Sequence, residues 1–435
     1  MKMKMIAALF IFCAVALGQA QYRVLYSFSG GTDGFAPQSL IFDHSGNLYG
    51  TTFWGGAGNP TNCGSSGCGT VFRLSPDGSG GWSETVLYTF CSQFECPDGA
   101  QPNGGLVLDS AGNLYGTTLD GGAAVAGGVV FELSPTPNGP WTETVLYSFC
   151  YDPCPTGFLP ANAIARDSAG NLYGATSLGG TCNVQSIGGC GTVFELSPPS
   201  RQGGPWTESV LYNFCSTGTT CPDGFSPVGG MTLDTHGNLF GTTEFGGSYV
   251  RTCRLGCGTI FKLSPTSGGW TYSLLYAPPS PSRGDSPLAP LTISSTDTVY
   301  GSFQYGGRNQ LGALFEIPAN GKGSEFSFPG NPGSLANPMA GLVLGRGLIS
   351  GSTYGKGSGS DPGNVFQLTS SGHETVLYTF CSQSNCTDGD GPLGLTQDGS
   401  GNLYGVAFQG GNPVCNHGLD EPPGCGVVFE ITPSR

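Results

Sequence analysis

Charged residues are scarce in this chain, and basic residues are the scarcest of them. Only 10% of the residues are charged, with 15 Lys and Arg against 29 Asp and Glu. An acidic surface repels phosphates, so this balance argues against nucleic acid and against an anionic membrane as a partner. The four histidines lie in turns or in a cysteine loop, and none stands near a repeated Ser, Cys or carboxylate in a triad-like order. These histidines are His44, His236, His373 and His417.

Long apolar runs are absent after the first twenty residues. The first run, over 6–17, follows Lys2 and Lys4 and ends in small residues, which is the pattern of a secretory signal peptide over 1–20. It is shorter than the roughly 20 residues that a membrane anchor needs. We therefore expect 21–435 to be exported to the periplasm, the cell surface or the medium, with no membrane insertion after cleavage.

The motif G-N-L-Y-G-T-T at Gly112–Thr118 recurs along the chain, so this is a repeat protein. The other copies are Gly46–Thr52, Gly170–Thr176, Gly237–Thr243 and Gly401–Ala407, with weaker versions at Asp297–Phe303 and Gly347–Thr353. With 76 Gly and 32 Pro the composition approaches that of low-complexity disorder. The glycines nevertheless alternate with regularly spaced Leu, Val, Tyr and Phe, which indicates turns between short strands.

One full unit, from Gly105 to Phe149, reads as four short strands separated by turn signals. The expected strands are 106–109, 113–118, 129–134 and 142–149. Four antiparallel strands repeated radially form a propeller blade, so seven copies predict a seven-bladed β-propeller that occupies 21–435 as one domain.

The two ends of the chain complement each other in this scheme. Only six fourth strands follow their own blades, and the chain ends on a third strand at Val427–Thr432 that lacks a partner. We predict that Arg23–Phe28 forms the outer strand of the last blade and closes the ring by pairing with that strand. An open β-solenoid is the alternative, but it would need capping repeats and no such offset between the ends.

Sixteen of the 17 cysteines follow the leader, and they form eight close pairs in the sequence. An even, local pattern behind a signal peptide predicts disulfides, whereas zinc would need about four ligands and each pair offers two thiols. The predicted bonds are Cys63–Cys68, Cys91–Cys96, Cys150–Cys154, Cys182–Cys190, Cys215–Cys221, Cys253–Cys257, Cys381–Cys386 and Cys415–Cys425. Such short loops gain only about 2 kcal/mol each in the chain-entropy model, so we expect the bonds to clamp single loops.

Three motifs recur in fixed order and carry a family resemblance: G-N-L-Y-G-T-T, G-T-V-F-E-L-S-P at Gly191–Pro198, and E-T-V-L-Y-S-F at Glu143–Phe149. With D-G-x-x-P between units, they resemble the GloVer tandem repeats of bacterial exported proteins called choice-of-anchor tandem repeat proteins. The resemblance covers essentially the whole chain after the leader. It implies an exported repeat protein, and it transfers no reaction, cofactor or active-site residue.

The motifs offer no clear catalytic or metal signature. Each D-x-x-G-N turn superficially resembles calcium-loop spacing, but a lone Asp before Gly-Asn suits a turn in which the carboxylate caps backbone amides. Recurring glutamates indicate architecture, because a catalytic pair should be unique. We therefore expect no cofactor, no metal and no catalytic residue, and we expect a monomer.

In an up-and-down blade, the second-to-third and fourth-to-first loops emerge at one end, and they carry all eight cysteine pairs. We call this end the disulfide face and expect binding there, because long loops on a rigid scaffold usually carry function. The candidate ligand contacts are Trp54, Phe245 and Tyr305 just beyond second strands, and Asp33, Asp98, Asp223 and Asp388 in D-G-x-x-P loops.

The leading hypothesis is a secreted, non-catalytic protein that binds a glycan or an extracellular protein through the disulfide face. The alternatives are a propeller lyase or hydrolase working on an extracellular substrate at the channel mouth, and a structural envelope protein. An enzyme should show a unique cluster of acid, base or metal ligands facing the channel. A binding module should instead show repeated polar and aromatic residues around the rim. Three or more His or carboxylate groups within metal-coordination reach would argue against the non-catalytic hypothesis.

Overall fold

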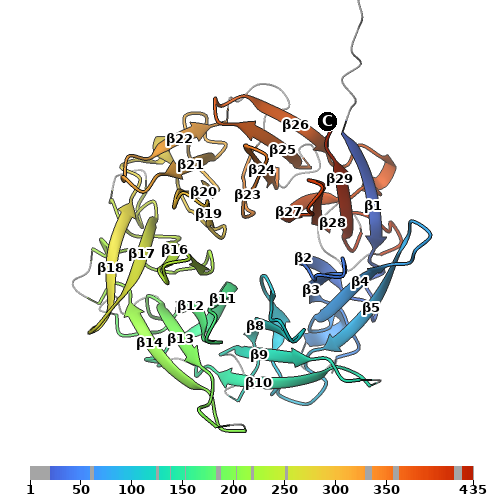
Figure 1. Cartoon of the computed structure of the whole chain (residues 1–435), viewed down its shortest axis with the longest axis horizontal. Helices are drawn as coiled ribbons and strands as arrows, with labels where there is room; N and C mark the ends of the chain where they lie inside the picture. The colour runs from blue at the N-terminus through green and yellow to red at the C-terminus, as the bar shows by residue number, and fades with distance from the viewer. Residues whose placement is uncertain are drawn as a thin grey trace, which may run out of the picture.

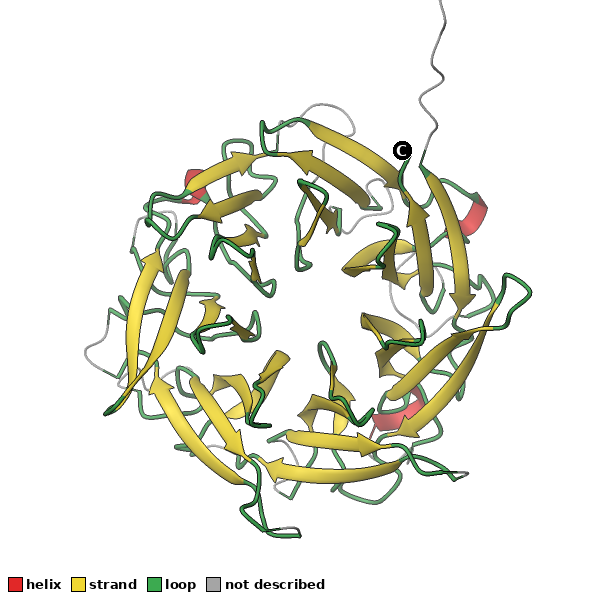
Figure 2. Cartoon of the chain, in the orientation of Figure 1, coloured by secondary structure: helices red, strands yellow, loops and turns green. Residues whose placement is uncertain are grey.

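The computed structural model arranges seven antiparallel sheets radially around a channel (Figures 1 and 2). It describes residues 20–58, 63–123, 127–137, 139–151, 153–182, 188–201, 203–216, 220–249, 253–328, 336–355, 362–415 and 424–434. The expected signal peptide lies almost wholly outside this range, since the description begins at Ala20. No helix in the described part is long and apolar enough to cross a membrane. The seven-bladed propeller is thus confirmed, and the open solenoid is wrong.

The strands keep the order expected from the repeat, innermost to outermost in each blade. Those of the first half are β1 Gln21–Ser27, β2 Phe35–Phe42, β3 Leu48–Trp54, β4 Thr70–Pro76, β5 Trp82–Thr89, β6 Ala100–Pro102, β7 Val107–Leu108, β8 Leu114–Asp120, β9 Val129–Ser134, β10 Thr142–Ser148, β11 Phe158–Arg166, β12 Leu172–Leu178, β13 Thr192–Ser197 and β14 Thr207–Asn213. Those of the second half are β15 Thr232–Leu233, β16 Leu239–Thr243, β17 Thr259–Thr266, β18 Gly269–Tyr276, β19 Thr292–Ile293, β20 Val299–Phe303, β21 Ala313–Ile317, β22 Ser324–Ser327, β23 Val343–Gly345, β24 Leu348–Thr353, β25 Asn364–Thr369, β26 Glu374–Thr379, β27 Asp390–Gln397, β28 Leu403–Gln409 and β29 Val427–Thr432. Three short 3-10 turns complete the described structure: η1 Gly64–Ser66, η2 Pro281–Arg283 and η3 Ser384–Cys386.

The two chain ends meet in one blade, as the repeat count predicts. Strand β1 runs antiparallel to β29, from the Gln21/Thr432 pair to the Ser27/Val427 pair. It begins two residues earlier than expected and ends one residue earlier. The strand ladders stay within the blades, so the ring is not one continuous hydrogen-bonded sheet. The N-terminal strand instead completes the last blade at the point where the ends meet in Figure 1.

Each blade has a buried phenylalanine on its third strand, and the repeated glycine of the second strand makes room for it. A Cβ at Gly116 would stand 2.6 Å from the Phe131 ring, so no larger residue fits that place. The outer strand of the preceding blade contributes a second ring, such as Phe90, whose centroid lies 5.0 Å from that of Phe131. These edge-to-face pairs join neighbouring blades through apolar packing.

The fifth blade achieves the same packing differently. Pro278 stands where the other outer strands end in phenylalanine, and Phe303 takes the place of the second-strand threonine. The Phe303 ring is fully buried, and its centroid lies 4.9 Å from that of Phe315. A ring from within the blade therefore fills the space that a neighbour fills elsewhere.

A second contact crosses every blade boundary, and we call it the inter-blade lock. It joins the glycine that precedes a third strand to a proline in the loop that enters the next blade, and in four of the seven blades this is the proline of the D-G-x-x-P motif. A Cβ on Gly191, for example, would lie 2.5 Å from Pro227 Cδ. The residue before that proline, Ser226, has a φ of +57° and donates its N–H to the Cys190 carbonyl oxygen at 2.9 Å.

The lock is present at all seven boundaries, including the one between the last and first blades. The backbone hydrogen bonds span 2.7–3.2 Å, with donors Ala36, Gln101, Leu159, Ser226, Ser286, Asn337 and Gly391 and acceptors Cys425, Cys68, Gly127, Cys190, Cys257, Leu311 and Pro362. The proline of this loop, which stays in place where the Asp of the D-G-x-x-P motif is lost, is therefore the part of the repeat that joins neighbouring blades.

Candidate functional site

The four predicted acids of the D-G-x-x-P loops lie inside their own loops. Asp98 is 7% exposed and accepts hydrogen bonds from Tyr88 Oη at 2.9 Å and from the Cys91 amide at 3.0 Å. Asp33, Asp223 and Asp388 accept equivalent bonds from Tyr26, Tyr212 and Tyr378. Burial and the neighbouring carboxylate raise the pKa of these tyrosines above the usual value. The geometry gives these acids a loop-ordering role, and ligand contact by any of them stays a prediction.

The three predicted aromatics have different surroundings. Trp54 packs edge-on against Phe53, and Phe245 packs against Phe225 on the paired strand. Tyr305 is 48% exposed and lines a pocket in the central channel, the channel pocket. Of the seven predicted contact residues, Tyr305 alone lines that pocket in the described structure.

The eight disulfides of the structure join the cysteines that the local spacing pairs. They lie in second-to-third loops and in the loops that lead from one blade to the next. Sulfurs of the two loop classes come within 4.8 Å of one another at the first blade, so both classes do emerge at one end.

The channel pocket has a volume of about 870 Å³, and residues of all seven blades line it. Its side walls include residues that directly follow second strands, so it opens toward the disulfide face. Five residues with amide side chains, from five blades, line it: Gln38, Asn103, Asn162, Gln304 and Asn337. Aromatic and aliphatic side chains alternate with them, including Tyr305, Tyr354, Phe408, Leu288, Met339 and Leu393.

Glu244 is the one charged residue among the described residues that line this pocket. Burial raises the pKa of its carboxyl, and the nearby negative charge of Asp285 adds to that effect, while a hydrogen bond with Ser226 opposes it. Burial also raises the pKa of Asp285. The channel mouth therefore holds a carboxyl that gains a proton more readily than a free glutamate does.

The inter-blade lock positions several pocket residues. The residue that donates across the boundary also accepts, through its carbonyl oxygen, the N–H of a residue after the second strand. These bonds are Glu244 to Ser226 at 2.9 Å, Gln304 to Ser286 at 3.1 Å and Tyr354 to Asn337 at 3.0 Å. Asn337 in addition donates its side-chain amide to the Gly355 carbonyl oxygen at 2.7 Å. The mouth is thus built on a rigid frame, which preorganises it for a ligand.

Sequence reasoning placed candidates just beyond the second strands, and the pocket shows that the residue one position earlier matters most. Glu244, Gln304, Tyr354 and Phe408 occupy that earlier position in four blades. Side chains alternate along a strand, so a shift of one residue moves the candidate from one face to the other. The residues two positions earlier, among them Thr242 and Ser302, share that face of the strand, and their repeated position was the available signal.

Four groups in the described part of the chain could hold a metal, and none of their residues is among those that line the pocket. Asp234, His236 and Asp297 offer atoms within 4.8 Å of one another, and they stand in first-to-second turns at the opposite face. Asp234 already accepts the amides of His236 and Asn238 and the side chain of Asn238. This group meets the three-ligand criterion stated from the sequence, so it counts against a non-catalytic protein, although it lies at the face opposite the channel mouth. The other groups are built on cysteines.

Comparison with known proteins bears on the family and the fold. The family model described as the Gloeobacter/Verrucomicrobia repeat matches residues 11–188 and 250–435. None of the curated proteins compared with the sequence matches it.

Among solved structures, virginiamycin B lyase from Staphylococcus aureus is similar with a TM-score of 0.55 and 16% identity, over 95% of this chain and 99% of that one. A streptogramin B lyase has a TM-score of 0.55 and 15% identity, over 95% and 97% of the two chains. A puromycin hydrolase has a TM-score of 0.51 and 13% identity, over 86% of this chain and 50% of that one. At these identities the likeness shows the fold alone.

Proposed function

This chain belongs to the Gloeobacter/Verrucomicrobia repeat family, and from that premise and the channel geometry we propose that it binds a glycan at the mouth on the disulfide face. The binding is non-catalytic in this proposal. The eight disulfides are typical of an oxidising compartment, so the proposed setting is outside the cytoplasm, where extracellular glycans occur.

The observation that carries the proposal is the mixture of amides and aromatics around the pocket. Each amide side chain both donates and accepts hydrogen bonds, which matches the hydroxyl groups of a sugar. Tyr305, Tyr354 and Phe408 supply flat apolar surface for the other faces of the ring. The volume of about 870 Å³ falls within the roughly 300–1,000 Å³ range of small-molecule sites, so a short oligosaccharide fits better than a protein surface.

A glycan panel followed by titration calorimetry tests this function. We expect Gln304→Ala to weaken binding of the selected glycan about tenfold, because a hydrogen bond worth about 1 kcal/mol is lost and a buried site is emptied. Gln409→Ala is the matched control, since Gln409 lies at the end of a second strand, close to the place of Gln304 after its own strand, but does not line the pocket. Equal loss in both variants, or no binding to any glycan on the panel, contradicts the proposal.

The carboxyl of Glu244 favours a second candidate, a lyase or hydrolase at the same mouth. A glutamate with a raised pKa can act as a general acid near neutral pH. Two of the similar structures are lyases and one is a hydrolase by their printed names, so this fold can carry such chemistry. The test is mass spectrometry of panel glycans after incubation with the protein. Product formation that Glu244→Gln abolishes without weakening binding favours the enzyme, and intact glycans favour the binding module.

A further inference from the structure

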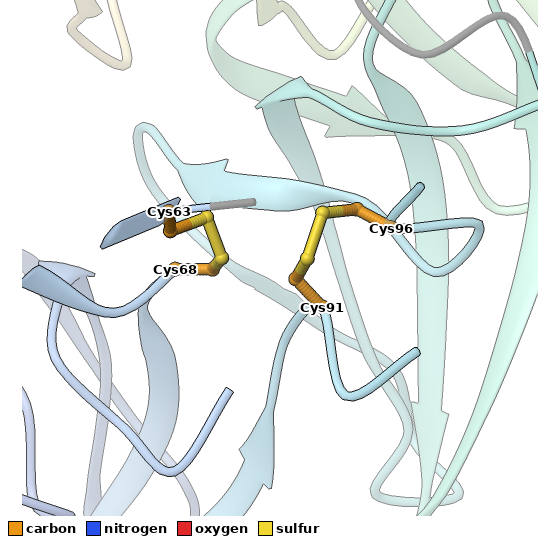
Figure 3. Close-up of side chains that lie close together, drawn as sticks. All are labelled: Cys63, Cys68, Cys91 and Cys96. Atoms are coloured by element: carbon orange, nitrogen blue, oxygen red, sulfur yellow. A yellow bond between two sulfur atoms is a disulfide. The ribbon is translucent and has the colours of Figure 1, made fainter. Parts of the chain in front are cut away.

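Four cysteine sulfurs from two separate loops meet beside the first blade (Figure 3). Cys63 and Cys68 lie in the loop between β3 and β4, and Cys91 and Cys96 lie in the loop that leads from β5 toward β6. Figure 3 shows the two disulfides facing each other across a short gap. All four Sγ atoms lie within 4.8 Å of one another. In the sequence each close pair of cysteines offers only two sulfurs as ligands. Four sulfurs come within reach of one ion only after the two loops have folded against each other.

The spacing within each pair is that of a zinc ligand set. Both pairs read Cys-x4-Cys, which lies within the Cys-x2–4-Cys spacing common in structural zinc sites. A tetrahedral site with Zn–S bonds of about 2.3 Å places its sulfurs about 3.8 Å apart. Sulfurs already within 4.8 Å reach that arrangement by side-chain rotation, and the Cα–Cα distances of 5.4 and 4.2 Å within the pairs can stay as they are.

We propose that this four-cysteine cluster binds a zinc ion when its two disulfides are reduced. Two other groups in the described structure are less complete. Cys182, Cys190 and Cys215 bring three sulfurs together with a longer spacing of Cys-x7-Cys, and Cys253 and Cys257 adjoin Asp285. Those groups come from the same two loop classes, which shows how the fold itself brings the cysteines together.

The chemistry needs a dithiol reductant, which the proposal supplies by class. Cys63 is the most exposed of the four, so a dithiolate attacks the Cys63–Cys68 bond there and Cys68 leaves as a thiolate. The second thiol of the reductant releases Cys63, and the reductant departs as a cyclic disulfide. Each protein disulfide takes up two electrons and two protons in this way. One Zn²⁺ then replaces the four thiol protons, which leaves a site with a net charge of −2.

The two states differ in what they connect. Each disulfide closes its own loop, whereas a zinc ion bound by all four sulfurs joins the β3–β4 loop to the loop that enters the next blade. Cys68, Cys91 and Cys96 are buried, so the bound ion is shielded from water and from competing ligands. The reduced protein therefore keeps this corner clamped when zinc is present.

The test uses the full exported chain reduced with dithiothreitol, freed of it without oxygen and loaded with zinc or cobalt alone. We expect C63S/C91S to hold one metal equivalent less than the reduced wild type and to lose part of the thiolate-to-cobalt absorption. C150S/C154S is the matched control, because its disulfide closes a similarly short Cys-x3-Cys loop but no sulfur of another pair joins it among the described groups. Equal metal content in the two variants overturns the proposal.

A second measurement covers a variant that fails to fold. The reduced wild type is alkylated with and without zinc, and its peptides are weighed by mass spectrometry. Zinc protection of Cys63, Cys68, Cys91 and Cys96, with Cys150 and Cys154 alkylated in both samples, supports the site. Alkylation of all four despite zinc overturns it.

Discussion

The inter-blade locks and the channel mouth lie a few residues apart and follow opposite rules. At the locks, all seven boundaries repeat one hydrogen bond and one glycine–proline contact. At the mouth, the residue that follows each second strand changes from blade to blade, from Glu244 to Gln304 to Tyr354. Repetition therefore marks what holds the ring together, and variation on the same frame marks where a ligand can be distinguished.

The largest expected loss of stability comes from adding a side chain at the glycine of an inter-blade lock. Gly191 has a φ of +86°, and a Cβ there would stand 2.3 Å from the Thr176 carbonyl oxygen as well as 2.5 Å from Pro227. We expect Gly191→Ala to lower the free energy of unfolding by about 4 kcal/mol, because backbone strain and a clash with backbone atoms add. Urea unfolding followed by tryptophan fluorescence measures the loss.

Gly46→Ala is the control for that variant. Gly46 has nearly the same φ, +85°, but no atom lies within 4 Å of the place that its Cβ would take. Backbone conformation alone should cost about 1 kcal/mol there. Equal losses at the two glycines would show that the lock contributes nothing beyond the left-handed turn.

The fifth blade tests the comparison further, because a phenylalanine of its own second strand fills the space that the neighbouring blade's phenylalanine fills elsewhere. Phe303→Thr introduces the residue that five of the other six blades have, yet we expect a loss of about 3 kcal/mol because Pro278 supplies no ring to fill the cavity. Adding Pro278→Phe to Phe303→Thr should recover a large part of it. Thermal unfolding of the two single variants and the double variant forms a cycle, and additive effects would contradict the exchange of rings.

The fold follows from the sequence where the information is local. Short sequence motifs predict the 129–134 strand, the pairing of β1 with β29 and the disulfides between cysteines close in the sequence. The inner strand of the second blade was expected at 106–109, where the structure has only β7, Val107–Leu108. It adds β6, Ala100–Pro102, before it, in the loop where Gln101 donates to the Cys68 carbonyl oxygen of the preceding blade.

The site was harder to predict because it depends on directions and on meetings between loops. Whether Glu244 or Phe245 faces the channel depends on the register of a strand relative to the axis, which no single repeat reveals. The meeting of Cys63 with Cys91 joins loops separated by a whole hairpin, so it appears only once the blade is folded.

The smallest expected effect concerns the pH dependence of stability. The glutamates that recur at the start of outer strands belong to the repeated frame of the ring, whereas Glu244 belongs to the channel mouth. Burial raises the pKa of Glu84, Glu143 and Glu208, at the start of three outer strands, to about 7. Because these values lie above the unfolded value of about 4.5, their contribution to stability is complete below pH 4.5 and is lost as pH rises through 7. We expect E84Q/E143Q/E208Q to raise the melting temperature at pH 8 by a few degrees and to flatten its decline between pH 5 and pH 8, with partial exposure keeping the effect small. Glu95→Gln, on an exposed loop, controls for the loss of negative charge. Glu244→Gln removes one carboxyl whose pKa is also raised, so it should alter ligand binding with pH and flatten the slope of stability less than the triple variant does. A triple variant with the slope of the wild type would mean that the repeated glutamates do not link protonation to the stability of the ring.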